Sequence, residues 1–183
     1  SPVMTDDEVS FVIEILNKIP LKTRNKVQEI TLDMAPNMEL IVKKYFPNAT
    51  LVTDRFHVQK LAVEALQEIR IKHRWEAIDA ENEAIEKAKY HKKKFNPEIL
   101  ENGETKKQLL ARSRYLLYKR ENKWTDNQKE RAKILFEIYP DLKTAYQLTT
   151  ELSNIFQQTT NKIYAFTKLA KWHEKVNQAG FKS

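Results

Sequence analysis

Asp33, Asp54 and His57 have the types and spacing of a catalytic or metal-binding group. Each aspartate ends a short strand-like run, and His57 follows Asp54 closely. In an open α/β sheet, ligands bind beyond the carboxyl ends of parallel strands, where two such carboxylates would lie. The spacing of Asp54 and His57 across a helix start can point both side chains the same way, as metal binding requires. Two alternatives stay open: each aspartate caps the following helix, or His57 completes that cap or pairs with Asp54.

A second group of candidate residues is basic. The net charge of +7 favours a polyanionic partner, because lysines and arginines that neutralise phosphates release condensed counterions. The densest basic positions are Lys87, Lys89, Lys92, Lys93, Lys94, Lys106, Lys107, Arg112, Arg114, Lys119 and Arg120. The alternative is a solvated helix face, since Glu81, Glu83 and Glu86 precede the lysines and can pair with them at helical spacing.

The composition favours a mainly helical globular protein that positions these residues. Of 183 residues, 41% are hydrophobic and 31% charged, and only 2 glycines are present for turns. No apolar run approaches the ~20 residues that cross a bilayer, and the N-terminal segment does not resemble a signal peptide. The absence of cysteine excludes disulfides, thiolate metal sites and a cysteine nucleophile. We therefore expect a cytoplasmic protein with no membrane partner.

The first 58 residues have the pattern of a small α/β unit. Thr5 and Glu8 form a capping-box pattern that predicts a helix ending near Pro20. The runs 27–33 and 50–54 predict two strands, and Pro36 begins a helix between them. A strand, helix and strand in this order predict parallel pairing through a right-handed crossover. Asp33 and Asp54 would then lie at the same end of adjacent strands.

Residues 59–183 are predicted to form a helical domain. One helix runs from Phe56 to about residue 92, and the loop 95–104 separates it from a shorter helix carrying Leu109, Leu110, Leu116 and Leu117. Three more helices follow, the first capped by Thr125 and the last ending at Gly180. We expect His73, His91 and His173 at the surface and Trp75, Trp124 and Trp172 in packing positions.

The segment ITLDMAPNMELIVKKYFPNATLVTDRFHVQKL resembles the catalytic domain of ISL3-family bacterial transposases. The family pattern is a strand ending in Asp-Met, a helix, then Phe-Pro-Asn-Ala and Asp-Arg-Phe-His-Val. Weaker resemblance runs through RYLLYKRENKWTDNQ and YPDLKTAYQL, so the likeness extends from about Val27 to the C-terminus.

The resemblance implies a DDE transposase that cleaves and joins DNA strands at insertion-sequence ends. Such enzymes use a ribonuclease-H-like fold in which two aspartates and a glutamate hold two Mg²⁺ or Mn²⁺ ions. It maps the second catalytic aspartate onto Asp33 and an Asp-x-x-His motif outside the triad onto Asp54 and His57. It also makes DNA the polyanion, for which we expect phosphate contacts from Arg55, Lys92, Lys93, Lys94, Lys106, Lys107, Arg112 and Arg114.

The departures from the family pattern predict a partial catalytic domain. The family's first aspartate precedes the strands found here, and its glutamate normally follows the helical insertion near Glu-Gly-x-Asn, a motif absent from this sequence. Because two-metal phosphoryl transfer needs several converging carboxylates, we expect an inactive fragment without a tightly bound metal pair. We expect its exposed strands to self-associate. The alternative function is a non-catalytic helical module that binds DNA or another protein.

Overall fold

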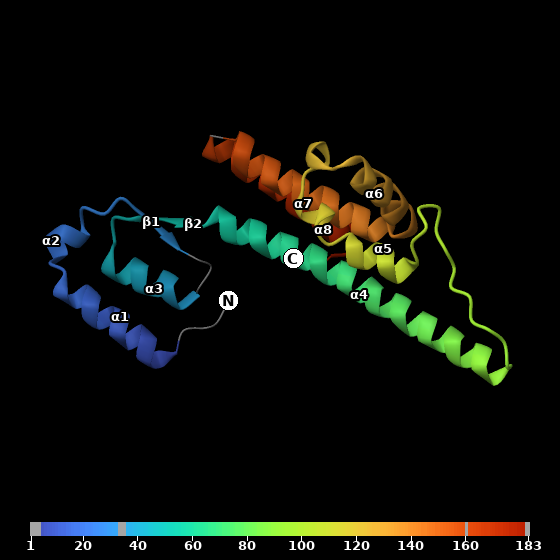
Figure 1. Cartoon of the computed structure of the whole chain (residues 1–183). Helices are drawn as coiled ribbons and strands as arrows, with labels where there is room; N and C mark the ends of the chain where they lie inside the picture. The colour runs from blue at the N-terminus through green and yellow to red at the C-terminus, as the bar shows by residue number, and fades with distance from the viewer. Residues whose placement is uncertain (1–4, 33–35, 160, 182–183) are drawn as a thin grey trace. The chain divides into compact units, whose positions relative to one another are not determined.

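The computed structural model describes residues 5–32, 36–159 and 161–181. The chain divides into two units, residues 1–58 and 59–183, which Figure 1 colours from blue through green to red. Helices dominate, and a parallel two-stranded sheet lies in the first unit. This architecture confirms the predicted fold class. Among the described residues, no helix is both long and apolar enough to cross a membrane.

The first unit begins with α1 (Asp6–Lys18), whose capping box was predicted from the sequence. The Thr5 hydroxyl accepts a hydrogen bond from the Glu8 amide at 3.4 Å, and the Glu8 carboxylate accepts one from the Thr5 amide at 2.9 Å. The short α2 (Leu21–Arg24) follows Pro20, and then come β1 (Glu29–Leu32), α3 (Pro36–Tyr45) and β2 (Thr50–Thr53). The predicted strand, helix and strand are all present.

The two strands are parallel, with Glu29 paired to Thr50 and Leu32 paired to Thr53. Helix α3 contacts both β1 and α1, and it buries Ile41, Val42 and Tyr45. Side chains alternate along β1, so that Ile30 and Leu32 are half-buried while their neighbours are exposed. The apolar residues of β1 therefore share one face of the strand, whereas the adjacent Leu51 and Val52 of β2 are both half-buried.

The second unit contains most of α4 (Arg55–Tyr90), followed by α5 (Lys106–Arg112), the 3₁₀ turns η1 (Leu116–Tyr118) and η2 (Glu121–Lys123), and the helices α6 (Asp126–Ile138), α7 (Pro140–Gln158) and α8 (Lys162–Gln178). Thr125 caps α6 through the predicted capping box, and Pro140 occupies the first turn of α7. Gly180 has the positive φ of +78° that commonly ends a helix.

The helix predicted to carry four leucines is in fact two elements. Leu109 and Leu110 lie on α5, whereas Leu116 and Leu117 lie in η1. The buried Ser113 hydroxyl donates to the Leu109 carbonyl at 2.6 Å at the end of α5. Serine bonding back to a carbonyl four residues earlier weakens a helix. The indole of Trp124 then donates to the Leu116 carbonyl at 2.8 Å, which fixes the turn.

The core of the second unit is made of leucines from several elements. Leu66 of α4 packs with the leucines of α5 and η1 and with Leu135 of α6 and Leu142 of α7. The buried Arg70 joins two of these elements, because its guanidinium donates to the Leu110 carbonyl at 3.0 Å and to Gln67 at 2.7 Å. These contacts hold α5 against α4.

Candidate functional site

The carboxyl end of the sheet is where the sequence predicted the catalytic carboxylates. Because β1 and β2 are parallel and Leu32 is paired with Thr53, the two strands end at the same edge. Asp33 follows Leu32 in the sequence but lies outside the described residues. Asp54 is half-buried at this edge, and its amide donates to the Leu32 carbonyl at 3.0 Å. The ladder therefore continues through Asp54.

The Asp54 carboxylate caps α4. The Asp54 Oδ1 atom accepts a hydrogen bond from the Phe56 amide at 2.9 Å. The backbone carbonyl of Asp54 accepts one from the Val58 amide at 3.3 Å. A carboxylate at this position satisfies an amide that has no partner within the helix and lies at the positive end of the helix dipole. This is the capping role left open by the sequence.

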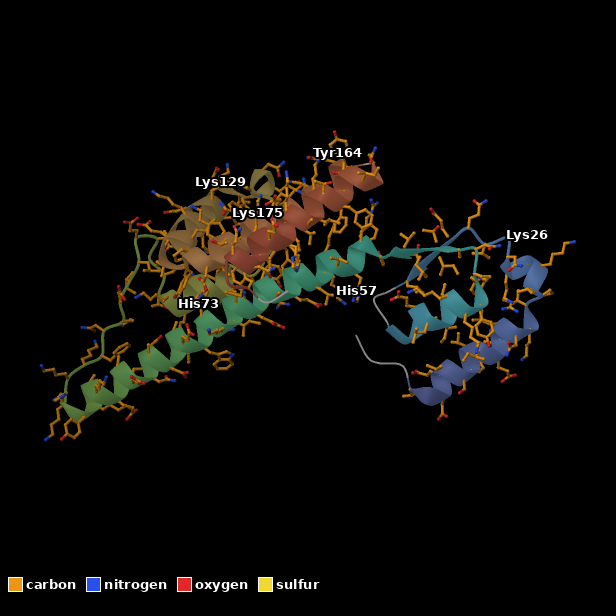
Figure 2. The ribbon with its side chains drawn as sticks, turned by 180° about the vertical axis from the view of Figure 1, so that it is seen from behind. Lys26, His57, His73, Lys129, Tyr164 and Lys175 are labelled. Atoms are coloured by element: carbon orange, nitrogen blue, oxygen red, sulfur yellow. The ribbon has the colours of Figure 1, made fainter. Side chains whose placement is uncertain are left out.

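His57 is half-buried in the first turn of α4, where Figure 2 labels it. Within the described parts of the chain, no three histidine, aspartate or glutamate side chains gather as metal ligands. The described side chains alone do not fit the pair of Mg²⁺ or Mn²⁺ ions that the resemblance implies, since such ions need several converging oxygen ligands.

Several of the basic residues predicted to contact phosphate are paired with carboxylates. Lys106 lies 2.9 Å from Glu98, and Lys107 lies 2.7 Å from Glu81. Arg112 lies 3.0 Å from Glu104. The exposed Arg114 has its guanidinium 5.7 Å from the centre of the Tyr115 ring, and Arg55 lies similarly beside Phe56 at 5.4 Å. Lys92, Lys93 and Lys94 are exposed just after α4. Their contact with DNA stays a prediction.

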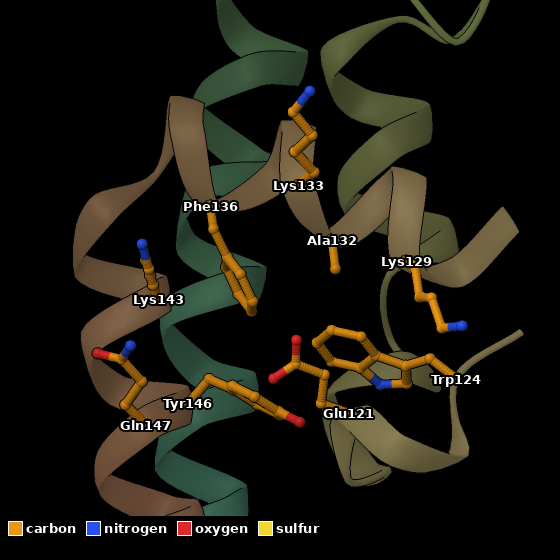
Figure 3. Close-up of a pocket in the computed structure, with 9 residues that line it drawn as sticks. All are labelled: Glu121, Trp124, Lys129, Ala132, Lys133, Phe136, Lys143, Tyr146 and Gln147. Atoms are coloured by element: carbon orange, nitrogen blue, oxygen red, sulfur yellow. The ribbon is translucent and has the colours of Figure 1, made fainter. Parts of the chain in front are cut away.

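A hollow of about 410 Å³ is lined by residues of α6 and α7 and by Glu121 and Trp124. Figure 3 shows the three aromatic rings among its lining residues. The rings of Phe136 and Trp124 each pack against Tyr146, with centroids 5.4 Å apart in both pairs. Lys133 and Lys143 stand at its rim, and Glu121 places its carboxylate among the rings. Trp124 is a core residue here, as the sequence predicted.

Glu104 is a buried carboxylate that the sequence reasoning missed. Arg131 of α6 donates to both of its oxygens, at 2.7 and 3.1 Å, and Arg112 of α5 donates at 3.0 Å. The hydrogen bonds from Arg131, opposed by burial and aided by Arg112, lower the pKa of Glu104 to about 2. Asn102 also donates to it at 3.0 Å. The cluster fastens the end of the 91–105 loop to two helices.

The prediction that His73 is an isolated surface residue is wrong. Its ring is half-buried and lies 2.7 Å from the Asp141 carboxylate of α7 and 3.0 Å from Glu76 of α4. The ring also packs on Tyr139, with centroids 4.6 Å apart. Trp75 also differs from expectation, since it is 62% exposed. Residue spacing within α4 could not have indicated that His73 has a partner on α7.

The comparisons with known proteins identify the family. A family model described as "Transposase", the ISL3-type DDE transposase model, matches residues 3–183. The chain belongs to this transposase family. The match includes both units, and it confirms the resemblance inferred from the Asp-Met and Asp-Arg-Phe-His-Val motifs. No curated protein and no solved structure matches the chain.

Proposed function

We propose that residues 1–58 belong to the ribonuclease-H-like catalytic core of a DDE transposase and that residues 59–183 are its helical insertion. The observation that carries this proposal is the parallel pair β1–β2, whose strands end in register at Leu32 and Thr53. An aspartate follows each of these residues in a chain that the transposase family model matches. The carboxyl edge of a parallel sheet is the usual place for such ligands.

In this proposal Asp33 is the catalytic residue and a metal ligand. Divalent ions bound by several carboxylates stabilise charge on the attacking and leaving oxygens of a DNA phosphodiester. The described side chains do not form such a group by themselves. Asp33 therefore acts with carboxylates beyond the described residues.

Asp54 is assigned a positioning role. Its amide bonds the Leu32 carbonyl and its carboxylate bonds the Phe56 amide, so a single residue joins the end of β1, the end of β2 and the start of α4. Replacing Asp54 with alanine removes the acceptor of the Phe56 amide and weakens the cap. The expected result is a displaced sheet edge and a partial loss of activity.

The test is DNA strand cleavage by the full-length protein at the terminal inverted repeats of its element, with Mg²⁺ or Mn²⁺. Asp33→Asn should lower the cleavage rate by roughly a thousandfold or more while DNA affinity is kept, because a metal ligand is lost. Asp54→Ala, which removes the cap of α4, should lower the rate by a smaller factor. Asp126→Asn, at a fully solvated carboxylate on α6, is the matched control and should change nothing.

Cleavage by the Asp33→Asn protein at the wild-type rate would overturn the catalytic assignment. If the wild-type protein binds DNA but no metal ion supports cleavage, the alternative of a non-catalytic helical DNA-binding module replaces it. The independent leucine core of residues 59–183 is the feature that would suit such a module.

A further inference from the structure

A second, smaller hollow of the helical unit lies between the start of α4, the η1 segment and α7. Its volume is about 190 Å³, enough for a phosphate group with several waters, each of which occupies about 30 Å³ in the liquid. The polar lining includes Lys119, Arg120, Thr149, Thr150 and Ser153. All these residues belong to the same unit, so the hollow does not depend on the placement of the sheet.

This hollow has no carboxylate in its lining. The aromatic hollow of Figure 3 contains Glu121, the hollow beside α5 contains Glu81 and Glu98, and the hollow between α7 and α8 contains Glu151. Two cations and several hydroxyl groups in a lining without a carboxylate favour an anion, and Glu121, which acts on Tyr146 from outside this lining, offsets part of their charge. A cationic ligand is excluded by the same charges.

Arg120 is held in place by neutral partners. Its Nη2 atom donates to the Ser153 hydroxyl oxygen at 3.2 Å and to Gln157 Oε1 at 2.6 Å. Neither partner carries a negative charge, so neither offsets the positive charge of the guanidinium. A guanidinium fixed in this way loses little rotamer entropy when its remaining N–H groups bind a planar or tetrahedral anion.

The neighbouring backbone is fixed as well. The Tyr146 hydroxyl donates to the Lys119 carbonyl at 2.9 Å, and the Lys119 amide donates to the Leu116 carbonyl at 3.1 Å. Burial raises the pKa of Tyr146, so this hydroxyl keeps its proton and remains a donor. Lys119 and Arg120 are thus presented on a segment that is already ordered before a ligand arrives.

Ser153 can complete the anion site. Its hydroxyl oxygen accepts hydrogen bonds from Arg120 and from Gln157 at 3.4 Å. The hydroxyl proton has no acceptor among the described residues, so it is available to an oxygen in the hollow. The Ser153 hydroxyl and the Arg120 guanidinium are donors that bind a phosphate group. The Lys119 ammonium donates to the neutral Gln128 Oε1 at 3.4 Å and adds a nearby positive charge.

We propose that this hollow binds one phosphate of the DNA backbone through Arg120, Lys119 and Ser153. The proposal rests on the proposed function, in which the protein acts on DNA, and it names residues that would contact a DNA phosphate. It also predicts a stronger phosphate contact at Arg120 than at Lys106, Lys107 and Arg112, whose side chains are already paired with carboxylates.

The competing explanation is that Arg120 only ties the η1–η2 segment to α7. The two explanations differ in how DNA binding depends on salt. A phosphate contact releases counterions, so its removal lowers the slope of log affinity against log salt concentration by about one. A structural tie would change stability and leave the salt slope unaltered.

The experiment measures the binding of the full chain to a short fluorescent DNA duplex by anisotropy over a series of salt concentrations. Arg120→Gln should weaken binding roughly tenfold, as the loss of a charge-assisted hydrogen bond predicts, and lower the salt slope by about one. Lys119→Gln, which keeps the Arg120 bonds to α7, should also lower the slope. Lys133→Gln removes an equal charge from the rim of the aromatic hollow and should have the smaller effect on both quantities.

Wild-type affinity and slope in both Arg120→Gln and Lys119→Gln would overturn the proposal, as would equal losses in all three variants. If Arg120→Gln fails to fold in a circular dichroism melt, Lys119→Gln and Ser153→Ala decide the matter. The catalytic role proposed for Asp33 is tested by a different measurement, the rate of DNA cleavage. Loss of salt slope in these variants together with normal cleavage by Asp33→Asn would retain the phosphate site and reject Asp33.

Discussion

In residues 1–58 the buried apolar side chains among those described are Ile41, Val42 and Tyr45, all on α3, whereas residues 59–183 bury leucines from α4, α5, η1, α6 and α7. The first unit contains the candidate catalytic edge and has a sheet of only two strands. Two-stranded sheets are marginally stable by themselves. The proposed chemistry therefore lies in the less well packed unit, whereas the helical unit has a core of its own.

Removal of a core leucine should destabilise the helical unit more than the sheet. Leu135→Ala removes a fully buried side chain from the centre of the helical core, and it should lower the free energy of unfolding of residues 59–183 by about 3–5 kcal/mol. Hydrogen exchange read residue by residue measures both units in one sample. The amides of β1 and β2 should exchange as in the wild type. An equal loss of protection in the strands would show that the two units fold as one.

The stability of the helical unit should fall at acidic pH because of the Glu104 carboxylate. Its pKa is lowered in the folded state to about 2 from an ordinary 4.5, so its stabilising contribution is fully present above pH 4.5 and is lost as the pH falls toward 2. The full shift corresponds to about 3 kcal/mol. Urea titrations of the helical unit should therefore show a decline in stability across this range.

Glu104→Gln is the matched variant for that titration. It should lower stability at neutral pH and flatten the decline between pH 4.5 and 2, because the group that titrates is gone. An unchanged pH dependence in this variant would assign the acid sensitivity to other carboxylates.

Weak self-association and fast amide exchange are expected at the two-stranded sheet. The two strands have few covering residues, so we expect weak self-association of the isolated chain through β1 and β2 and faster amide exchange at Ile30, Leu32, Leu51 and Val52 than in α6 and α7. Light scattering over a concentration series checks the association. Thr31→Lys, which places a charge at an exposed strand position, should reduce it. A monomer with equally protected strands and helices would contradict this expectation.

Local features of the fold were predictable from the sequence. The capping boxes of Thr5 and Thr125 are contained within four residues, and the strand–helix–strand order determines the parallel pairing of β1 and β2. These elements depend on neighbouring residues and on the right-handed crossover. The prediction for Asp33 followed from the family resemblance and stays a prediction, because that residue lies outside the described parts of the chain.

Features that join distant parts of the chain were not predictable. Glu104 and Arg131 are 27 positions apart, and His73 and Asp141 are 68 apart, so neither pair has a signature in residue spacing. The position of η1 also depends on a contact from beyond the element, since the Trp124 indole donates to the Leu116 carbonyl, which the Lys119 amide also bonds. Sequence patterns therefore predicted the elements and missed the polar contacts that join them.

The bonds that hold α5 to α4 have a consequence for limited proteolysis. Lys92, Lys93 and Lys94 are exposed in the loop after α4, and Lys92 has a positive φ of +53°, so trypsin should cleave there first. The two resulting pieces would still be joined by Arg70 to the Leu110 carbonyl and by Gln67 to the Arg114 carbonyl. A nicked protein should therefore migrate as two bands in a denaturing gel and elute as a single species from a native column.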